Sequence, residues 1–223
     1  LLDKACMKTD FELVWASVYT FACMRMDKFV HDRVIFAGDA AHGVSPFGAR
    51  GANSGVQDAE NLAWKLALVL GGKSPRALID SYGTEREYAA DDNIKQSTRS
   101  TDFITPKSEI SHVFRRAVLD LARQHPFARS LVNSGRLSTA TGLRSSPLHT
   151  TDEDNGKGVV FPPSALAVGS VMHGQTNTDT DTIERDGVTY LVRPDGHIAA
   201  RWLHPTELQV QASRNKACGG MVC

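Results

Sequence analysis

The segment from Arg33 to Leu70 constrains the fold more than any other part of this 223-residue chain. Residues 33–37 form a short apolar run of the kind found in buried strands of parallel sheets. A loop with five glycines and one proline follows, over residues 38–55. A helix is predicted after the loop, because apolar residues recur at steps of three and four up to Gly71. This order of strand, Gly-rich loop and helix predicts an α/β fold.

The loop has the residue types of a ligand-binding site. Gly38 permits close backbone approach, and Asp39 follows the predicted strand at the sheet edge where α/β folds bind ligands. A carboxylate there suits ribose hydroxyls and would repel a phosphate. Gly48 and Gly51 free the backbone to turn, and a helix capped by Asn53 or Ser54 would add the positive end of its dipole. The alternative is a helix-capping turn in which Asp39 makes only structural hydrogen bonds.

The rest of the chain predicts further elements. Residues 11–24 are rich in β-branched and aromatic types and predict a strand covered on both faces. Ser74 and Pro75 begin a second helix that reaches about residue 96, and residues 97–105 form a polar connection. Ser108 begins a third, amphipathic helix. Pro126 ends that helix or starts a short continuation to Val132.

The C-terminal part carries weaker signals. Residues 133–158 are rich in Ser, Thr, Gly and Asp and predict a linker or a long surface loop. Residues 188–192 and 197–202 predict two strands joined by a β-turn at residues 193–196. No clear pattern follows Pro205. A hairpin alone is marginally stable, so these strands must pack on another part of the protein.

Composition excludes several classes of function. Lys+Arg and Asp+Glu are both 25, so nothing predicts a broad basic surface for nucleic acid. No apolar stretch approaches the length of a membrane span, and no signal peptide is evident, so a cytoplasmic location without nucleic-acid or membrane partners is predicted. The cysteines lack metal-ligand spacing and are interpreted as buried or inert thiols, with a Cys218–Cys223 disulfide as the alternative. No metal site is predicted.

Two stretches of the loop region resemble a known motif. Residues 33–42 read RVIFAGDAAH, and residues 46–58 follow the pattern P-x-G-x-x-G-x-N-x-G-x-x-D. Together they resemble the second FAD-binding motif of class A flavoprotein aromatic hydroxylases, most closely the phenol and 3-(3-hydroxyphenyl)propionate branch. The similarity extends over about residues 10–148. Residues 190–202 are similar to the end of the thioredoxin-like C-terminal domain of that branch.

This resemblance implies a domain organisation. Residues 1–28 would be the last strand or strands of a substrate domain, and residues 29–132 the C-terminal part of a Rossmann-like FAD-binding domain with its following helices. Residues 133–158 would be a linker, and residues 159–223 a truncated thioredoxin-like segment. The family's first Gly-x-Gly-x-x-Gly loop is absent from the sequence, which predicts a C-terminal fragment or truncated product. Alone it would bind FAD weakly or not at all.

The resemblance also implies an activity. The complete enzyme would be an FAD-dependent monooxygenase that hydroxylates a phenolic substrate with NAD(P)H and O2 through a flavin C4a-hydroperoxide. Two alternatives stay open: a non-catalytic FAD-binding, nucleotide-binding or interaction module, and an inactive truncated relic. Besides the phenol and O2, the partners would be a second copy of the chain or a missing amino-terminal half.

The motif carries over to individual positions. Asp39 would bind the ribityl or ribose part of FAD, Gly38 and Ala40 would allow close packing near the pyrophosphate, and Pro46 would lie by the ring and the substrate. Gly48 and Gly51 would shape the loop around the ring. Backbone N–H groups near Ala52 and Asn53 would face the flavin N1–C2=O edge. No residue is assigned as catalytic with certainty. His42 is interpreted as structural rather than as a base, and the aromatics Trp15, Tyr19 and Phe21 as core rather than ring contacts.

Overall fold

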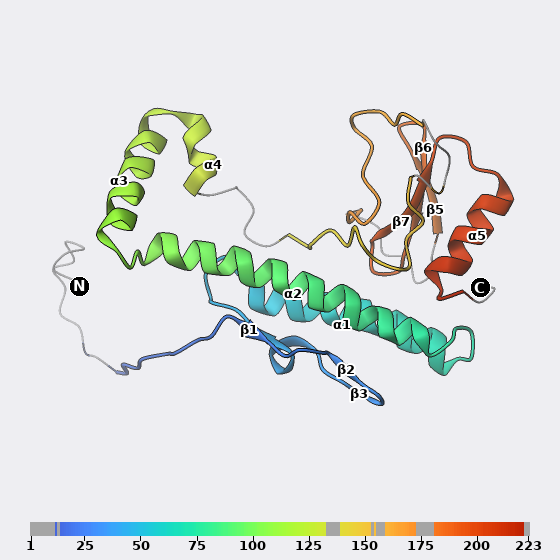
Figure 1. The fold of residues 1–223 in the computed structure, drawn as a ribbon, viewed down its shortest axis with the longest axis horizontal. Coiled ribbons are helices and arrows are strands. Elements are labelled where there is room, and N and C mark those ends of the chain that lie inside the picture. Colours follow the sequence, from blue (N-terminus) through green and yellow to red (C-terminus); the bar gives the residue numbers. More distant parts are fainter. Residues whose placement is uncertain are drawn as a thin grey trace.

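The computed structural model describes residue 12 and residues 14–132, 139–152, 154, 159–172 and 181–220. Its centre is a pair of long helices, α1 (Arg50–Leu70) and α2 (Ala77–Ile104), which run side by side (Figure 1). Short strands lie along one side of this pair, and a C-terminal sheet with its own helix lies on the other (Figure 1). The described part is therefore a mixed α/β structure.

The first strands are only two residues long. β1 (Met24–Arg25) pairs with β4 (His42–Gly43), and β2 (Val30–His31) pairs with β3 (Val34–Ile35). Both pairs are antiparallel. The parallel strand expected at residues 33–37 is therefore not found: β3 turns back on β2 in a tight hairpin, with Asp32 at a φ of 50°.

The strand expected over residues 11–24 was wrong except at its last residue. Phe11 and Leu13 lie outside the described residues. Residues 14–23 have no regular structure, and four large side chains among them are 79–95% exposed: Val14, Trp15, Val18 and Tyr19. A strand needs a neighbour for its backbone N–H and C=O groups. The described chain pairs none with this segment.

Helix α1 begins earlier than expected and buries a different face. Its first residue is Arg50, so neither Asn53 nor Ser54 caps it, whereas its end at Gly71 agrees with the prediction. Most of its buried residues are polar: Ser54, Asp58, Asn61 and Lys65, together with Trp64. The predicted apolar stripe is only partly buried: Val56 is 58% exposed, whereas Leu62 and Val69 pack against core residues. The helix therefore meets α2 through polar contacts as well as through Leu62 and Trp64, which pack with apolar residues of α2.

Helix α2 continues through the polar stretch that was expected to end it. Three hydroxyls of this stretch bond back to the helix backbone, as Thr101 Oγ1 donates to the Ser97 carbonyl at 2.9 Å. Ser100 and Thr105 make the same bond to carbonyls four residues earlier. Such bonds let Ser and Thr remain helical.

The next helices agree with the prediction. The side chain of Ser108 caps α3 (Glu109–Gln124) by accepting the Ser111 N–H at 3.2 Å. Pro126 begins the short turn η3 (Pro126–Ala128), which leads into α4 (Arg129–Val132). These helices extend away from the rest of the described chain (Figure 1). Their large apolar side chains are mostly exposed, including Ile110, Val113, Phe114, Phe127 and Leu131.

The C-terminal sheet has one more strand than expected. β5 (Asp181–Arg185), β6 (Val188–Val192) and β7 (Ile198–Trp202) are antiparallel. Asp186 and Gly187 join β5 to β6 with positive φ at both positions, as a two-residue hairpin turn requires. Residues 193–196 form the predicted turn, in which Gly196 N–H donates to the Arg193 carbonyl at 2.9 Å.

Both faces of this sheet are covered, as the marginal stability of a lone hairpin required. Met172 packs on one face with Tyr190 and Ile198. Ala217, at the end of α5 (Glu207–Ala217), packs on the other. Thr206 and Gln209 form a capping box that begins α5, an element not predicted.

The segment between the helices and the sheet is packed rather than free. Leu143 is 1% and Leu148 is 4% exposed within residues 139–152. Thr150 N–H donates to the Ala199 carbonyl on β7. Of the cysteines, Cys23 is a free thiol, whereas Cys218 is disulfide-bonded and so departs from the thiol interpretation. Cys223, the partner named in the alternative prediction, lies outside the described residues.

Candidate functional site

The end of the strand region lies directly against the start of α1. Gly38 opens the short 3-10 turn η2 (Gly38–Ala40) at a φ of 58°, a conformation that favours glycine. A Cβ built on Gly55 would lie 3.6 Å from the Gly38 Cα. The two glycines thus let the loop and the helix pack backbone to backbone, which brings η2 beside the first turns of α1.

A buried carboxylate holds this arrangement in place. Asp58 Oδ2 accepts the Gly38 N–H at 2.8 Å and the His42 Nε2 at 2.7 Å, and Asp58 Oδ1 accepts the Arg86 Nε at 2.6 Å. We call Gly38, His42, Asp58 and Arg86 the loop cluster. Burial alone would raise the pKa of Asp58, but the hydrogen bond from His42 and the charge of Arg86 outweigh it and lower the pKa. Asp58 is therefore an ionised anchor.

A second buried contact fixes the middle of the loop. Ser45 Oγ lies 2.5 Å from Ser97 Oγ on α2 and 2.8 Å from Thr101 Oγ1. Near the start of α1, Arg50 Nη1 donates to the side-chain oxygen of Asn93 at 3.0 Å. The loop is thus tied to α2 along its length, so the residues that it exposes have defined positions.

The predicted cofactor residues occupy the exposed part of this loop. Asp39, Ala40, Pro46, Ala52 and Asn53 are exposed, and Gly48 has a φ of 93°. Asn53 Nδ2 donates to the Ala49 carbonyl at 2.6 Å, and the Pro46 carbonyl accepts the Ala49 N–H at 3.4 Å. These contacts keep the loop in a tight turn before α1.

The start of α1 can accept an electron-rich group. Ala49 precedes the helix at a φ of 52°, and no side chain caps the first turn. The first N–H groups of an α-helix have no partner inside the helix, and its dipole favours negative charge there. Gly51 and Ala52 belong to this first turn. The residues therefore fit a flavin whose N1–C2=O edge becomes negative on reduction.

Among the other candidates, His42 agrees with its structural interpretation. It is buried, bonded to Asp58 and stacked on Phe29 with ring centroids 5.7 Å apart. The core interpretation of Trp15 and Tyr19 was wrong, since they are 79% and 80% exposed. Phe21 meets Phe47 of the loop edge to face, with ring centroids 6.1 Å apart.

A second buried network joins the helices to the C-terminal hairpin and was not predicted. Arg193 donates to both carboxylate oxygens of Glu85, at 2.5 and 2.9 Å, and to Asp195 at 2.5 and 3.0 Å. Lys65 Nζ donates to Glu85 at 2.7 Å, and Asn61 Nδ2 bridges Glu85 and Asp195. We call these five residues the hairpin cluster. Only the turn at 193–196 was visible in the sequence.

Burial sets the pKa values around this cluster. It would raise the pKa of Glu85, but the charges of Arg193 and Lys65 hold that pKa well below its ordinary value. Burial lowers the pKa of Lys65 to about 8 against the opposing charge of Glu85. Burial and the charge of Arg193 lower the pKa of His149 to about 3. His149 is therefore neutral at pH 7, and its Nε2 lies 3.3 Å from Arg193 Nη1.

Acid should destabilise the fold before any buried carboxylate is protonated. Below pH 6.5 an unfolded chain protonates His149, whereas the folded chain does not until about pH 3. The free energy of unfolding should thus fall by about 1.4 kcal/mol per pH unit between pH 6.5 and 4.5. Urea unfolding of His149→Gln over this window should show a flatter slope, because glutamine still offers Arg193 an acceptor. Equal slopes for both proteins would contradict this assignment.

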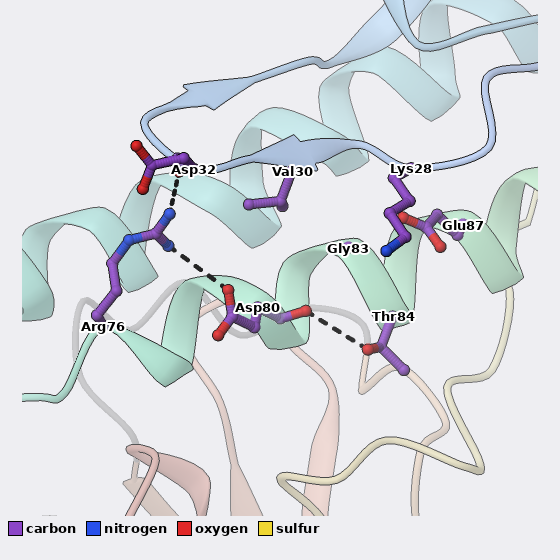
Figure 2. A pocket seen from close by; sticks show the side chains of 8 residues that line it. All are labelled: Lys28, Val30, Asp32, Arg76, Asp80, Gly83, Thr84 and Glu87. Carbon is purple, nitrogen blue, oxygen red and sulfur yellow. Dashed lines mark hydrogen bonds and ion pairs between the residues drawn. The ribbon is translucent and has the colours of Figure 1, made fainter.

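Open cavities occur elsewhere on the surface. Figure 2 shows one of about 480 Å³ between β2 and the start of α2, where Arg76 bonds the Asp32 carbonyl and Asp80. Lys28 and Glu87 line the same cavity (Figure 2), so charges of both signs face it. Another cavity, of about 280 Å³, runs beside α1 from Asn53 to Asn61. Asp39 does not line either of them.

The described residues include neither a membrane-spanning helix nor a cluster of metal ligands. None of the helices there is both long and apolar enough to cross a membrane. The same residues contain no group of three or more His, Cys, Asp or Glu that could hold a metal ion.

Comparison with known proteins identifies relatives of this chain. Residues 3–97 match the family model described as an FAD binding domain. The chain is 31% identical over 217 residues to rifampicin monooxygenase from Rhodococcus hoagii, covering 89% of this chain and 45% of that protein. It is 44% identical over 107 residues to a 3-(3-hydroxy-phenyl)propionate/3-hydroxycinnamic acid hydroxylase from Klebsiella pneumoniae (strain 342), covering 48% and 19%.

A third relative is named as a synthase and not as a monooxygenase or hydroxylase. Dialkyldecalin synthase from Streptomyces rugosporus is 31% identical over 197 residues, covering 84% of this chain and 42% of that protein. Among solved structures, the Diels-Alderase PyrE3 of pyrroindomycin biosynthesis superposes with a TM-score of 0.63 at 26% identity, covering 99% of this chain and 49% of that one. The chain spans less than half the length of these curated relatives.

Proposed function

The chain belongs to the class A FAD-dependent aromatic monooxygenase family, and on this premise we propose that residues 38–53 form part of the flavin-binding cleft of a phenol-hydroxylating enzyme. The observation that carries the proposal is the uncapped start of α1 beside the exposed Asp39. The loop cluster holds both at a fixed spacing. The name of the hydroxylase relative supports a phenolic substrate. We also propose NAD(P)H and O2 as co-substrates.

Each exposed residue has a role in this proposal. Asp39 would accept hydrogen bonds from the ribityl or ribose hydroxyls, and Gly38 and Ala40 would leave room for the pyrophosphate. Pro46 would lie beside the ring and the phenol, and Gly48 would shape the turn. The N–H groups of Gly51, Ala52 and Asn53 would face the pyrimidine edge of the ring.

Bound FAD would supply the redox chemistry, which amino-acid side chains do not provide. The contribution of this chain is position and electrostatics. The dipole of α1 offsets negative charge that develops at the ring, and it needs no rearrangement at that moment because α1 is tied to α2. The loop cluster keeps η2 from moving as the ligand binds.

We also propose the domain organisation that the resemblance implies. Residues 1–28 would end a substrate domain, 29–132 complete a Rossmann-like FAD-binding domain, 133–158 link it to the next unit, and 159–223 form a truncated thioredoxin-like segment. The β6–β7 hairpin followed by α5 supports the last assignment. Location in the cytoplasm and association with a second copy stay predictions.

A second candidate is a ring-forming synthase that keeps the flavin-binding fold. The observation that favours it is the similarity to dialkyldecalin synthase, which extends over 84% of this chain. Such a protein would share the loop and differ in whether it consumes O2 and NAD(P)H. The test uses the protein extended to the length of its relatives and measures consumption of O2 and of NAD(P)H. Consumption of either co-substrate would favour the monooxygenase over the synthase.

Replacing Asp39 should weaken flavin binding without affecting stability. The chain alone should bind FAD weakly. Asp39→Asn should lower the affinity for FAD by about a further tenfold, because a charge-assisted hydrogen bond is lost. Quenching of flavin fluorescence on titration with protein measures both affinities. The control is Asp32→Asn, an exposed carboxylate at the β2–β3 turn. Equal affinity of Asp39→Asn and the parent chain would rule out the assigned role.

A further inference from the structure

Asn61 lines the cavity beside α1 and carries a buried acceptor without a partner in the described part of the chain. Asn61 is 1% exposed, and its Nδ2 donates to Glu85 and Asp195. Its Oδ1 is buried and has no hydrogen-bond partner among the described residues. Leaving an acceptor buried and unpaired is costly, so a donor at this point would stabilise the structure.

Other acceptors line the same cavity. His197 is 5% exposed, and its Nδ1 lies 3.0 Å from the Gly169 carbonyl, which leaves Nε2 as an acceptor. Glu60 is exposed and places a carboxylate at the cavity. Asp195 also lines it, although Arg193 neutralises its charge from within the hairpin cluster. No Lys or Arg is among the lining residues.

The cavity is too large to be filled by a single water molecule. Its volume of about 280 Å³ is room for roughly nine waters at about 30 Å³ each. A small organic ligand of several heavy atoms also fits. The cavity has one wall on α1 and another formed by Ala140, Val171 and the β6–β7 turn, so its occupant would touch both the helices and the sheet.

From the unpaired Asn61 Oδ1, the neighbouring acceptors and the lone negative charge of Glu60, we propose that this cavity binds the primary ammonium group of a small organic molecule. The ammonium group has three N–H donors and no acceptor, which matches the acceptors of Asn61, Glu60 and His197. One donor would satisfy Asn61 Oδ1, and Glu60 would supply the opposite charge. The site adjoins the proposed flavin cleft at Asn53, whereas Asp39, Pro46 and Gly48 do not line it.

The test uses the full chain without FAD, labelled with ¹⁵N and titrated with methylammonium chloride. We expect saturable shifts of the Asn61 side-chain NH2 and of the Ala140 and Val171 amides, with millimolar affinity because so small a ligand makes few contacts. Tetramethylammonium has the same charge and no N–H donor, so it should produce no saturable shift. Equal responses to both ions, or no saturable response to methylammonium, would overturn the proposal.

A pair of variants tests the role of charge. Glu60→Gln should weaken methylammonium binding by about two- to fivefold, as expected for a solvent-exposed ion pair. The matched control is Glu109→Gln, an exposed carboxylate at the start of α3, which should leave the affinity unchanged. Neither position belongs to the loop cluster or the hairpin cluster, so both variants should fold. Equal weakening by the two substitutions would show general charge screening and refute the site.

Discussion

Replacing Arg193 by Met is expected to lower the free energy of unfolding by about 3–5 kcal/mol. Arg193 is fully buried and is the partner of two buried carboxylates, Glu85 and Asp195. Methionine preserves much of the volume but leaves both carboxylates facing each other with only Lys65 to balance them. An uncompensated buried charge costs far more than the loss of an exposed ion pair, which is why the expected effect is large.

Urea unfolding followed by circular dichroism measures this loss. The control is Arg185→Met on β5, whose side chain is 62% exposed and whose nearest carboxylate, that of Asp186, is 3.8 Å away. That change should cost less than about 0.5 kcal/mol. Combining Arg193→Met with Glu85→Gln should cost less than the sum of the two single changes, because the pair is coupled. Full additivity would contradict a shared cluster.

Replacing Asp58 by Asn is expected to cost a similar amount, about 3–5 kcal/mol, and to loosen the Gly-rich loop. The substitution leaves Arg86 buried without an opposite charge, as its remaining contacts, to Ser54 and Gln57, are 3.5 Å long. The new amide would also direct N–H donors at groups that now donate to the carboxylate. The Gly38 amide would then lose its acceptor.

Two measurements separate the global effect from the local one. Urea unfolding gives the change in stability, and hydrogen exchange of the Gly38 amide under native conditions reports opening of the loop. We expect that amide to exchange much faster in Asp58→Asn than in the parent chain. Asp80→Asn is the control, since Asp80 is an exposed carboxylate on α2, 3.7 Å from Arg76. If Gly38 kept its protection in Asp58→Asn, Asp58 would not be the anchor of the loop.

Local signals in the sequence predicted several boundaries correctly. Ser108 caps α3, Gly71 ends α1, and residues 193–196 turn between β6 and β7. Each depends on a side chain or backbone conformation within a few residues, which is information that a short segment contains. Two further local signals were present and not used: Thr206 with Gln209 as a capping box, and Asp186 with Gly187 as a hairpin turn.

Contacts between distant segments could not be predicted in the same way. Hydrophobic periodicity placed the buried face of α1 on Val56 and its apolar neighbours, whereas α2 covers Ser54, Asp58 and Lys65. Polar residues become buried only where partners of matching chemistry lie opposite. Glu85 and Arg193 are 108 residues apart, so no local pattern reveals that they meet.

The candidate loop itself was the most predictable part of the site. Its glycines, Asp39 and the following helix were identified from the residues and from the family resemblance. Its anchors were less visible, because Asp58 depends on His42 and on Arg86 of another helix. A sequence therefore indicates candidate ligand-binding residues more readily than the residues that hold their loop in place.

Neighbouring positions on α2 serve the two clusters: Glu85 belongs to one and Arg86 to the other. A single change at either position leaves a charge stranded in the protein interior, so evolution should reject it. Only exchanges made together with a partner, such as Glu85 with Arg193, should persist. Across related sequences, these positions should covary as linked sets while exposed charges on the same helix drift independently.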